Sequence, residues 1–187
     1  MIIDCPVCNG DKTAESTTKK DNIPHFGDIL ETTIICKSCG YKHNDIICLE
    51  QKEPMKYTLQ IKKSNLASRV IKSQSATVSI PELGLKVEPG PKSLGYISNV
   101  EGTIIRFEEG VKKALKIFDD DESQKNGLKI LNNISSLLKG KFEATLIIED
   151  PFGQSNIMDI DVKKEELTED ELKNLKTGFT IFEGNDI

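Results

Sequence analysis

The sequence contains no tryptophan and only two histidines, His25 and His43. Both histidines fall within the first 50 residues, so the rest of the chain has no imidazole for a two-histidine metal oxygenase site or a Ser-His dyad. No segment has the GxxxxGK[ST] pattern of a phosphate-binding loop. Paired carboxylates such as Asp119 and Asp121 fall in a charged run that is typical of a solvated turn. The sequence therefore predicts a protein that is not an enzyme.

Long apolar segments are also absent. No run approaches the ~18 apolar residues that a membrane-spanning helix requires. The chain reaches its first cysteine at position 5, which leaves no room for a signal peptide. We therefore expect a cytoplasmic protein that does not associate with membranes, in a compartment that keeps thiols reduced.

Four of the five cysteines form two matched Cys-x-x-Cys pairs, with 27 residues between the pairs. A turn of this length places two thiolates about 3.5–4 Å apart, as two corners of a tetrahedron around zinc with Zn–S bonds near ~2.3 Å. Asn9 and Gly40 follow the pairs, and both residue types tolerate the left-handed backbone of such a turn. The pattern predicts a zinc ribbon with one structural Zn²⁺, which is bound by four thiolates: Cys5, Cys8, Cys36 and Cys39.

Several alternatives remain open for these cysteines. The pairs could form two disulfides or a redox Cys-x-x-Cys site, and His43 could replace one thiolate. Cys48 lies in an apolar run and is either a buried free thiol or a further ligand or redox partner. Four thiolates around zinc leave no open position, so the expected metal supports structure and does not activate water.

The zinc module is expected to span residues 1–53. Stretches rich in threonine and isoleucine, Thr13–Lys19 and Asp28–Ile35, predict the two arms of the ribbon. A loop between them exposes apolar residues that either plug the ribbon or contact a partner. The partner-binding candidates in this loop are Ile23, Pro24 and Phe26.

Residues 54–187 predict a mostly β domain with an α-helical insertion at about 98–140. Alternating apolar residues indicate strands between 57 and 87, at 142–148 and at 158–162. Asp150-Pro151-Phe152-Gly153 has the composition of a type I turn. Thr168-x-x-Glu171 predicts the capping box of a short helix that ends near Gly178, before a last strand at Phe179–Glu183.

The insertion is predicted to be a helical hairpin. Apolar residues recur at three- and four-residue steps from Val100 to Phe118, after a capping box at Ser98-x-x-Glu101. The acidic run Asp119–Glu122 predicts a turn. A second helix follows, with Leu128, Leu131, Ile134 and Leu138 on its apolar face, and it is expected to stop at Gly140.

The net charge is −5, and it is distributed unevenly along the chain. Residues 1–53 carry −3, residues 54–148 carry +5 and residues 149–187 carry −7. An acidic protein is a poor general nucleic-acid binder, because neutralisation of phosphates dominates that affinity. A nucleic-acid-binding ribbon acting in translation or transcription is the alternative function. Its phosphate contacts would come from Lys12, Lys19, Lys20, Lys37 and Lys42.

The combined motifs resemble those of the ZPR-one zinc-finger proteins over nearly the whole chain. The resemblance rests on the two cysteine pairs with Ile23–Asp28 between them, on Arg69-Val70-Ile71-Lys72-Ser73 followed by Ile80–Leu83, and on Glu149–Ser155. It implies a ribbon similar to that of translation initiation factor two beta, followed by a double-stranded β-helix that carries the helical hairpin. Eukaryotic members have two such modules in tandem, whereas this chain has one and resembles the archaeal form.

The resemblance also implies a function. Family members bind translation elongation factor 1-alpha, preferentially with GDP, and assist its folding. Arg69 and Lys72 are further candidates for contact with an acidic partner, although both are equally compatible with the outer face of an ordinary strand.

Overall fold

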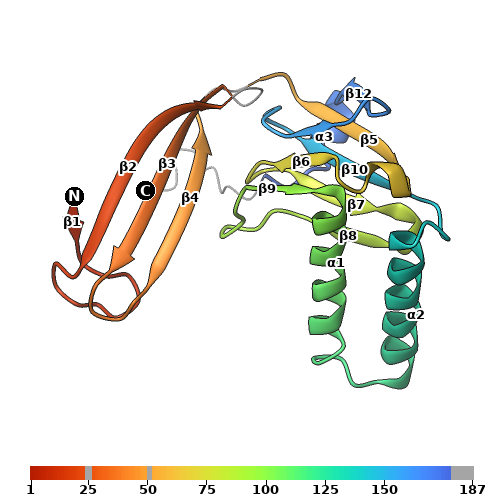
Figure 1. Ribbon diagram of the computed structural model, residues 1–187, viewed down its shortest axis with the longest axis horizontal. Coiled ribbons are helices and arrows are strands. Elements are labelled where there is room, and N and C mark those ends of the chain that lie inside the picture. Colours follow the sequence, from red (N-terminus) through yellow and green to blue (C-terminus); the bar gives the residue numbers. More distant parts are fainter. Residues whose placement is uncertain (24–26, 50–51, 178–187) are drawn as a thin grey trace. The chain divides into compact units, whose positions relative to one another are not determined.

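The computed structural model describes residues 1–23, 27–49 and 52–177 (Figure 1). The chain divides into two compact units, Met1–Lys52 and Glu53–Ile187. In the described residues, the first unit contains strands only, and the second contains strands and helices. None of the described helices is both long and apolar enough to cross a membrane.

The first unit is an antiparallel sheet whose strand order follows the chain: β1 (Ile2–Ile3), β2 (Ala14–Ile23), β3 (Gly27–Cys36) and β4 (Lys42–Cys48). Strands β2 and β3 pair along their whole length, from Ala14 opposite Cys36 to Ile23 opposite Gly27. Their threonines and isoleucines are β-branched and fit a pleated surface well. The two expected arms of the ribbon lie on this pair of strands. The sequence did not predict β1 and β4, which extend the sheet on either side.

The second unit contains two sheets. The larger has the order β12 (Lys163–Glu166), β5 (Met55–Ile61), β10 (Ala144–Asp150), β7 (Thr77–Ile80) and β8 (Leu85–Val87). The smaller has the order β11 (Asn156–Met158), β6 (Arg69–Lys72) and β9 (Tyr96–Asn99). Every pair of neighbouring strands is antiparallel.

Strand β10 lies between β5 and β7, so residues far apart in the chain form the middle of the larger sheet. Leu146 pairs with Leu59, and Ile148 pairs with Val78. Alternate residues of β10 from Ala144 onward are buried, as the predicted alternation requires. The largest fully buried side chains come from both sheets and from the helices: Leu59, Val70, Ile80, Val100, Ile104, Ile134, Leu137, Leu146, Ile148 and Ile157.

The insertion between β9 and β10 is a pair of helices, α1 (Val100–Ala114) and α2 (Asp121–Leu138), which run side by side in opposite directions (Figure 1). The helices pack closely at Gly127, where a Cβ atom would lie 2.4 Å from Cδ2 of Leu115. Gly140 has a left-handed φ of 71° and ends α2, as predicted. Its amide donates to the Leu137 carbonyl, and the Lys141 amide donates to the Ser136 carbonyl. The predicted mostly β fold with a helical hairpin insertion is confirmed.

Both predicted starts of these helices are wrong in detail. The cap of α1 is Asn99 and not Ser98, because the Asn99 side chain accepts a 2.7 Å hydrogen bond from the Gly102 amide. The acidic run is not only a turn, since α2 begins at Asp121 with Asp120 as its cap. Carboxylates in a first helical turn are favourable because they face the positive end of the helix dipole.

The predicted apolar face of α2 is also wrong in part. Leu128 is 55% exposed, and the buried residues of this helix are Gly127, Ile134 and Leu137. The buried stripe is therefore displaced toward the face that Gly127 presents to α1.

The strand predicted at 158–162 is wrong in both position and register. Strand β11 covers Asn156–Met158, with Ile157 buried opposite Val70, and Ile160 is 99% exposed. Leu83 was likewise expected in a strand, but it lies in a short 3-10 helix at Pro81–Leu83. Each error concerns a short segment in which partners distant in sequence decide which face is buried.

The capping box at Thr168-x-x-Glu171 is confirmed. The Glu171 amide donates to Thr168 Oγ1, and the Thr168 amide donates to Glu171 Oε2. The helix that follows, α3 (Glu169–Lys173), ends well before Gly178. The last predicted strand, Phe179–Glu183, lies outside the described residues.

Candidate metal centre

The four paired cysteines meet at one end of the four-stranded sheet. Cys5 and Cys8 lie in the connection from β1 to β2, and Cys36 and Cys39 lie where β3 turns into β4. Their four sulfurs all lie within 4.8 Å of one another. Across the two turns, the Cys5 and Cys39 sulfurs are 3.7 Å apart and the Cys8 and Cys36 sulfurs are 3.9 Å apart. A tetrahedron with Zn–S bonds of ~2.3 Å has edges of about 3.8 Å, so these side chains fit zinc.

The two turns have the same internal structure. In each, the sulfur of the first cysteine accepts hydrogen bonds from the amides two and three residues further along the chain. Cys5 accepts from Val7 and Cys8 (3.4 and 3.5 Å), and Cys36 accepts from Ser38 and Cys39 (3.4 and 3.5 Å). Asn9 and Gly40 follow with left-handed φ values of 54° and 73°, as the sequence predicted. Amide donors pointing at sulfur stabilise the thiolate form that metals bind.

The electrostatics of the cluster favour a bound cation. The amide of Cys39, with contributions from Thr13 and Ser38, lowers the pKa of Cys36 to about 6. The Tyr41 amide favours the Cys39 thiolate, but burial and the other three thiols outweigh it and raise the pKa of Cys39 to about 12. The cluster therefore forms a first thiolate readily and resists the last, because like charges repel at these distances. A divalent metal removes that repulsion.

The alternatives for the cysteines can be compared with this geometry. All four clustered cysteines are free thiols, and no disulfide joins them. His43 is not part of the cluster, and its ring stacks on Tyr41 with centroids 6.2 Å apart. The side chain of Cys48 lies outside the described residues. The site is thus a four-sulfur cluster, the donor set of closed structural zinc sites.

Comparison with known proteins shows the family to which the chain belongs. A model of the ZPR1 jelly-roll domain matches residues 64–178. An uncharacterized ZPR1-like protein of Methanocaldococcus jannaschii is 41% identical over 182 residues, which cover 97% of this chain and 92% of that protein. A ZPR1-like protein of Pyrococcus horikoshii is 36% identical over 193 residues, covering 98% of this chain and 85% of that protein. The chain belongs to the ZPR1 family.

Membership of the ZPR1 family confirms the resemblance found in the sequence and identifies the second unit as a jelly-roll domain. Among eukaryotic relatives, the zinc finger chaperone zpr1 of Schizosaccharomyces pombe is 30% identical over 158 residues. That alignment covers 81% of this chain but 34% of the yeast protein. The zinc finger names of such relatives and the four-sulfur cluster together support zinc binding.

The partner-binding candidates are found in different environments. Ile23 ends β2, but its side chain lies outside the described residues, as do Pro24 and Phe26. Arg69 is exposed on β6. Lys72, at the other end of the same strand, is only 4% exposed, so it is not on the outer face of an ordinary strand.

Two of the motifs on which the family resemblance rests, Arg69–Ser73 and Glu149–Ser155, meet in a buried polar cluster, which the sequence did not predict. Asp150 is fully buried, and its carboxylate accepts hydrogen bonds from Ser75 Oγ (3.1 Å) and from the amides of Phe152 (3.0 Å) and Gln154 (2.9 Å). Ser155 Oγ accepts from the Ser73 amide at 2.9 Å. The cluster thus ties the predicted turn after β10 to the segment after β6. The signal in the sequence was the polar residues within or next to each motif: Ser73 and Ser75 in the first case, Asp150 and Ser155 in the second.

The ribbon offers little support for the nucleic-acid alternative. Lys19, Lys20 and Lys37 each form an ion pair, with Asp21 (2.6 Å), Asp28 (2.6 Å) and Glu15 (3.3 Å) respectively. These carboxylates neutralise the cations that would have to contact phosphates.

Proposed function

We propose that this ZPR1-family protein is a non-enzymatic chaperone of the cytoplasm that binds translation elongation factor 1-alpha. One structural zinc ion would stabilise its N-terminal ribbon. The client would be the GDP-bound or nascent factor, and binding would assist its folding. The observation that carries this proposal is the match over 81% of the chain to a yeast relative named as a chaperone. The identity of the client rests on the family resemblance in the sequence.

The exposed apolar side chains support binding to a protein. At the turn between α1 and α2, Ile117 is 74% exposed and Phe118 is 55% exposed. In the first cysteine turn, Val7 is 60% exposed. Neighbouring large apolar residues at a protruding turn are typical of contact surfaces, where buried apolar anchors supply much of the binding energy.

The metal would contribute rigidity. Bound zinc neutralises the four thiolates and holds the two cysteine turns together. The backbone amides of the turns orient the Cys5 and Cys36 sulfurs, and Val7 projects from between the ligands. A rigid turn presents an apolar side chain with little loss of conformational entropy on binding.

The test is calorimetric titration of the zinc-loaded protein with elongation factor 1-alpha from the same host, in the GDP-bound, GTP-bound and nucleotide-free states. The second readout is the yield of active factor on refolding from denaturant, with and without this protein. We expect binding that favours the GDP-bound or nucleotide-free factor, together with a higher refolding yield. No binding in any state would refute the proposal.

A double substitution, Ile117→Ser with Phe118→Ser, tests the turn of the helical hairpin. We expect it to weaken the complex at least tenfold, since burial of each side chain contributes ~1.5–3 kcal/mol. Ile160→Ser is the matched control, because Ile160 is 99% exposed in a different turn. Equal affinity of both variants would exclude the hairpin turn from the interface. The refolding assay would then still test the chaperone proposal independently.

A further inference from the structure

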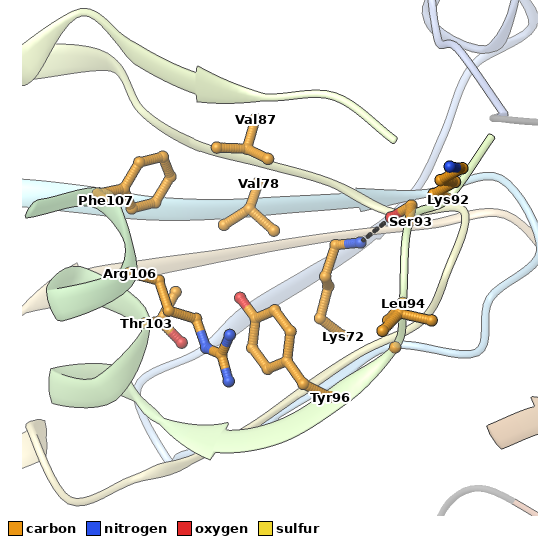
Figure 2. Close-up of a pocket in the computed structure, with 11 residues that line it drawn as sticks. Lys72, Val78, Val87, Lys92, Ser93, Leu94, Tyr96, Thr103, Arg106 and Phe107 are labelled. Atoms are coloured by element: carbon orange, nitrogen blue, oxygen red, sulfur yellow. Dashed lines mark hydrogen bonds between the residues drawn. The ribbon is translucent and has the colours of Figure 1, made fainter. Parts of the chain in front are cut away.

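A cavity of about 470 Å³ opens in the jelly-roll domain (Figure 2). Its walls come from both sheets, through β6, β7, β8 and β9, from α1 and from the connection between β8 and β9. Small-molecule sites in proteins have similar volumes, ~300–1,000 Å³, and are usually apolar with a few placed polar groups.

One part of the wall is apolar. Val78 and Val87 lie together on one side of the cavity, and Phe107 lies next to them, on α1 (Figure 2). Val87 is 50% exposed and Leu94 is 47% exposed, so both lie where the cavity opens to solvent. These side chains fit an apolar or aromatic body.

The floor of the cavity contains a buried cation. Lys72 is 4% exposed, extends beside Tyr96 toward Ser93, and donates a 3.1 Å hydrogen bond from Nζ to Ser93 Oγ (Figure 2). An ammonium has three donors, and Ser93 accepts from only one of them. Burial lowers the pKa of Lys72 to about 8, against a weaker opposing effect of the Asp150 charge.

Among the described residues, the cations that line the cavity form no ion pair. The lining includes Lys72, Lys92 and Arg106, and none of its described residues is acidic. The Arg106 guanidinium lies over the Tyr96 ring, 4.3 Å from its centroid. Because burying an unpaired cation is unfavourable, an anion in the cavity would remove a cost that the fold otherwise bears.

The backbone around the cation is closely fitted. The Ser93 amide donates to the Gly90 carbonyl at 2.9 Å, which turns the β8–β9 connection toward β6. A Cβ atom at position 95 would lie 3.1 Å from the Lys72 carbonyl oxygen, so Gly95 allows the connection to approach the strand. The position of the Ser93 hydroxyl beside Lys72 thus follows from this packing.

We propose that the cavity binds a small organic anion, with one carboxylate or phosphate group attached to an apolar or aromatic body. The oxyanion contacts Lys72 and Ser93, with Lys92 beside them. The apolar body lies against Val78, Val87 and Phe107. This site is separate from the zinc cluster, and it does not depend on the identity of the client protein.

The test uses two aromatic anions and two control compounds, one that lacks the negative charge and one that lacks the aromatic body. The full-length zinc-loaded protein is titrated in a calorimeter with 4-phenylbutyrate, phenyl phosphate, 4-phenylbutanol and inorganic phosphate. We expect one of the two aromatic anions to bind one-to-one, at least tenfold more tightly than the neutral alcohol or inorganic phosphate. The tighter aromatic anion identifies the oxyanion that the cavity prefers. Equal affinity for the alcohol, or no binding of either aromatic anion, would overturn the proposal.

Variants locate the binding in the cavity. Lys72→Met removes the cation and is expected to weaken the anion at least tenfold, the fold-change that corresponds to ~1.4 kcal/mol. Val87→Trp fills the cavity from an exposed position and should block binding without disturbing the core. Lys86→Met, which alters an exposed lysine on the same strand as Val87, is the matched control and should bind normally. Unchanged affinity in both Lys72→Met and Val87→Trp would show that the anion binds elsewhere.

An NMR titration provides a second readout. In protein with ¹³C-methylated lysines, we expect the bound anion to raise the Lys72 pKa and to leave the Lys86 resonance unmoved, because Lys72 lines the cavity and Lys86 does not. A Lys72 titration curve that is identical with and without the probe would contradict direct contact.

Discussion

Replacement of Asp150 by alanine tests whether the buried polar cluster stabilises the jelly-roll domain. The carboxylate is fully buried and accepts three hydrogen bonds, from Ser75 Oγ and from the Phe152 and Gln154 amides. Hydrogen bonds to a charged group contribute ~1.5–3 kcal/mol each, and all three are lost in Asp150→Ala. The cost of burying the charge in the folded state disappears as well and offsets part of this loss. We expect the free energy of unfolding to fall by about 3–5 kcal/mol.

The assay is guanidinium denaturation followed by circular dichroism at 222 nm. All described α-helices lie in the second unit, so this signal reports the unfolding of that unit. Asp150→Asn keeps the shape but turns one acceptor into a donor that faces another donor, and we expect an intermediate loss of about 2 kcal/mol. Asp161→Ala is the control, because Asp161 is 53% exposed in an ion pair with Lys62 and should cost less than about 1 kcal/mol.

The comparison between the buried and the exposed aspartate decides whether the hydrogen bonds of Asp150 stabilise the domain. If Asp150→Ala costs no more than Asp161→Ala, the three hydrogen bonds do not hold the turn after β10, and the stabilising role assigned to the cluster is wrong. A loss confined to Asp150→Ala and Asp150→Asn would show that the turn and the segment after β6 stabilise each other.

Three other perturbations have defined outcomes. Thr77 is 1% exposed, and its hydroxyl has no hydrogen-bond partner in the described structure, so Thr77→Val should raise the free energy of unfolding by about 1 kcal/mol in the same denaturation assay. Lys72 has a folded-state pKa of about 8, below the ordinary 10.5, so the unfolded chain binds more protons between these pH values and stability should rise with pH there. The Lys72→Met variant should lack that rise and be more stable than the unsubstituted protein at pH 7 by about 2 kcal/mol. A pH profile of the variant that runs parallel to that of the unsubstituted protein would contradict the lowered Lys72 pKa. Cys8→Ser, or treatment with a strong chelator, should remove zinc measured by atomic absorption and expose residues 1–52 to proteolysis, because metal binding supplies on the order of 10–16 kcal/mol to the folding of such sites; retained zinc would exclude Cys8 as a ligand.

The local features of this protein were predictable from neighbouring residues. The cysteine turns depend on two-residue spacing and on Asn9 and Gly40, whose left-handed conformations are properties of those residues. The end of α2 at Gly140 and the capping box at Thr168 also involve hydrogen bonds within a few residues. The alternation of buried residues along β10 was clear because the strand is long enough to show its period.

Features that depend on distant partners were not predictable in this way. Ile157 is buried because β11 pairs with β6, and a shift of one residue in that pairing would exchange the two faces of the strand, whereas Ile160 follows the strand in a turn and is exposed. One error was local: the acidic run at the start of α2 was interpreted as a solvated turn, although the same residues suit a helix N-terminus.

The sequence by itself determined the four-sulfur site, the family and the helical hairpin inserted between strands, because spacing and period are encoded over short stretches of chain. Only the tertiary structure decided that Asp150 accepts from Ser75 and that Lys72 lies on the floor of a cavity. Both side chains are charged, and a charged residue in a strand pattern is ordinarily assigned to the surface. Their burial depends on the packing of two sheets whose strands come from opposite ends of the domain. Local sequence does not contain that information.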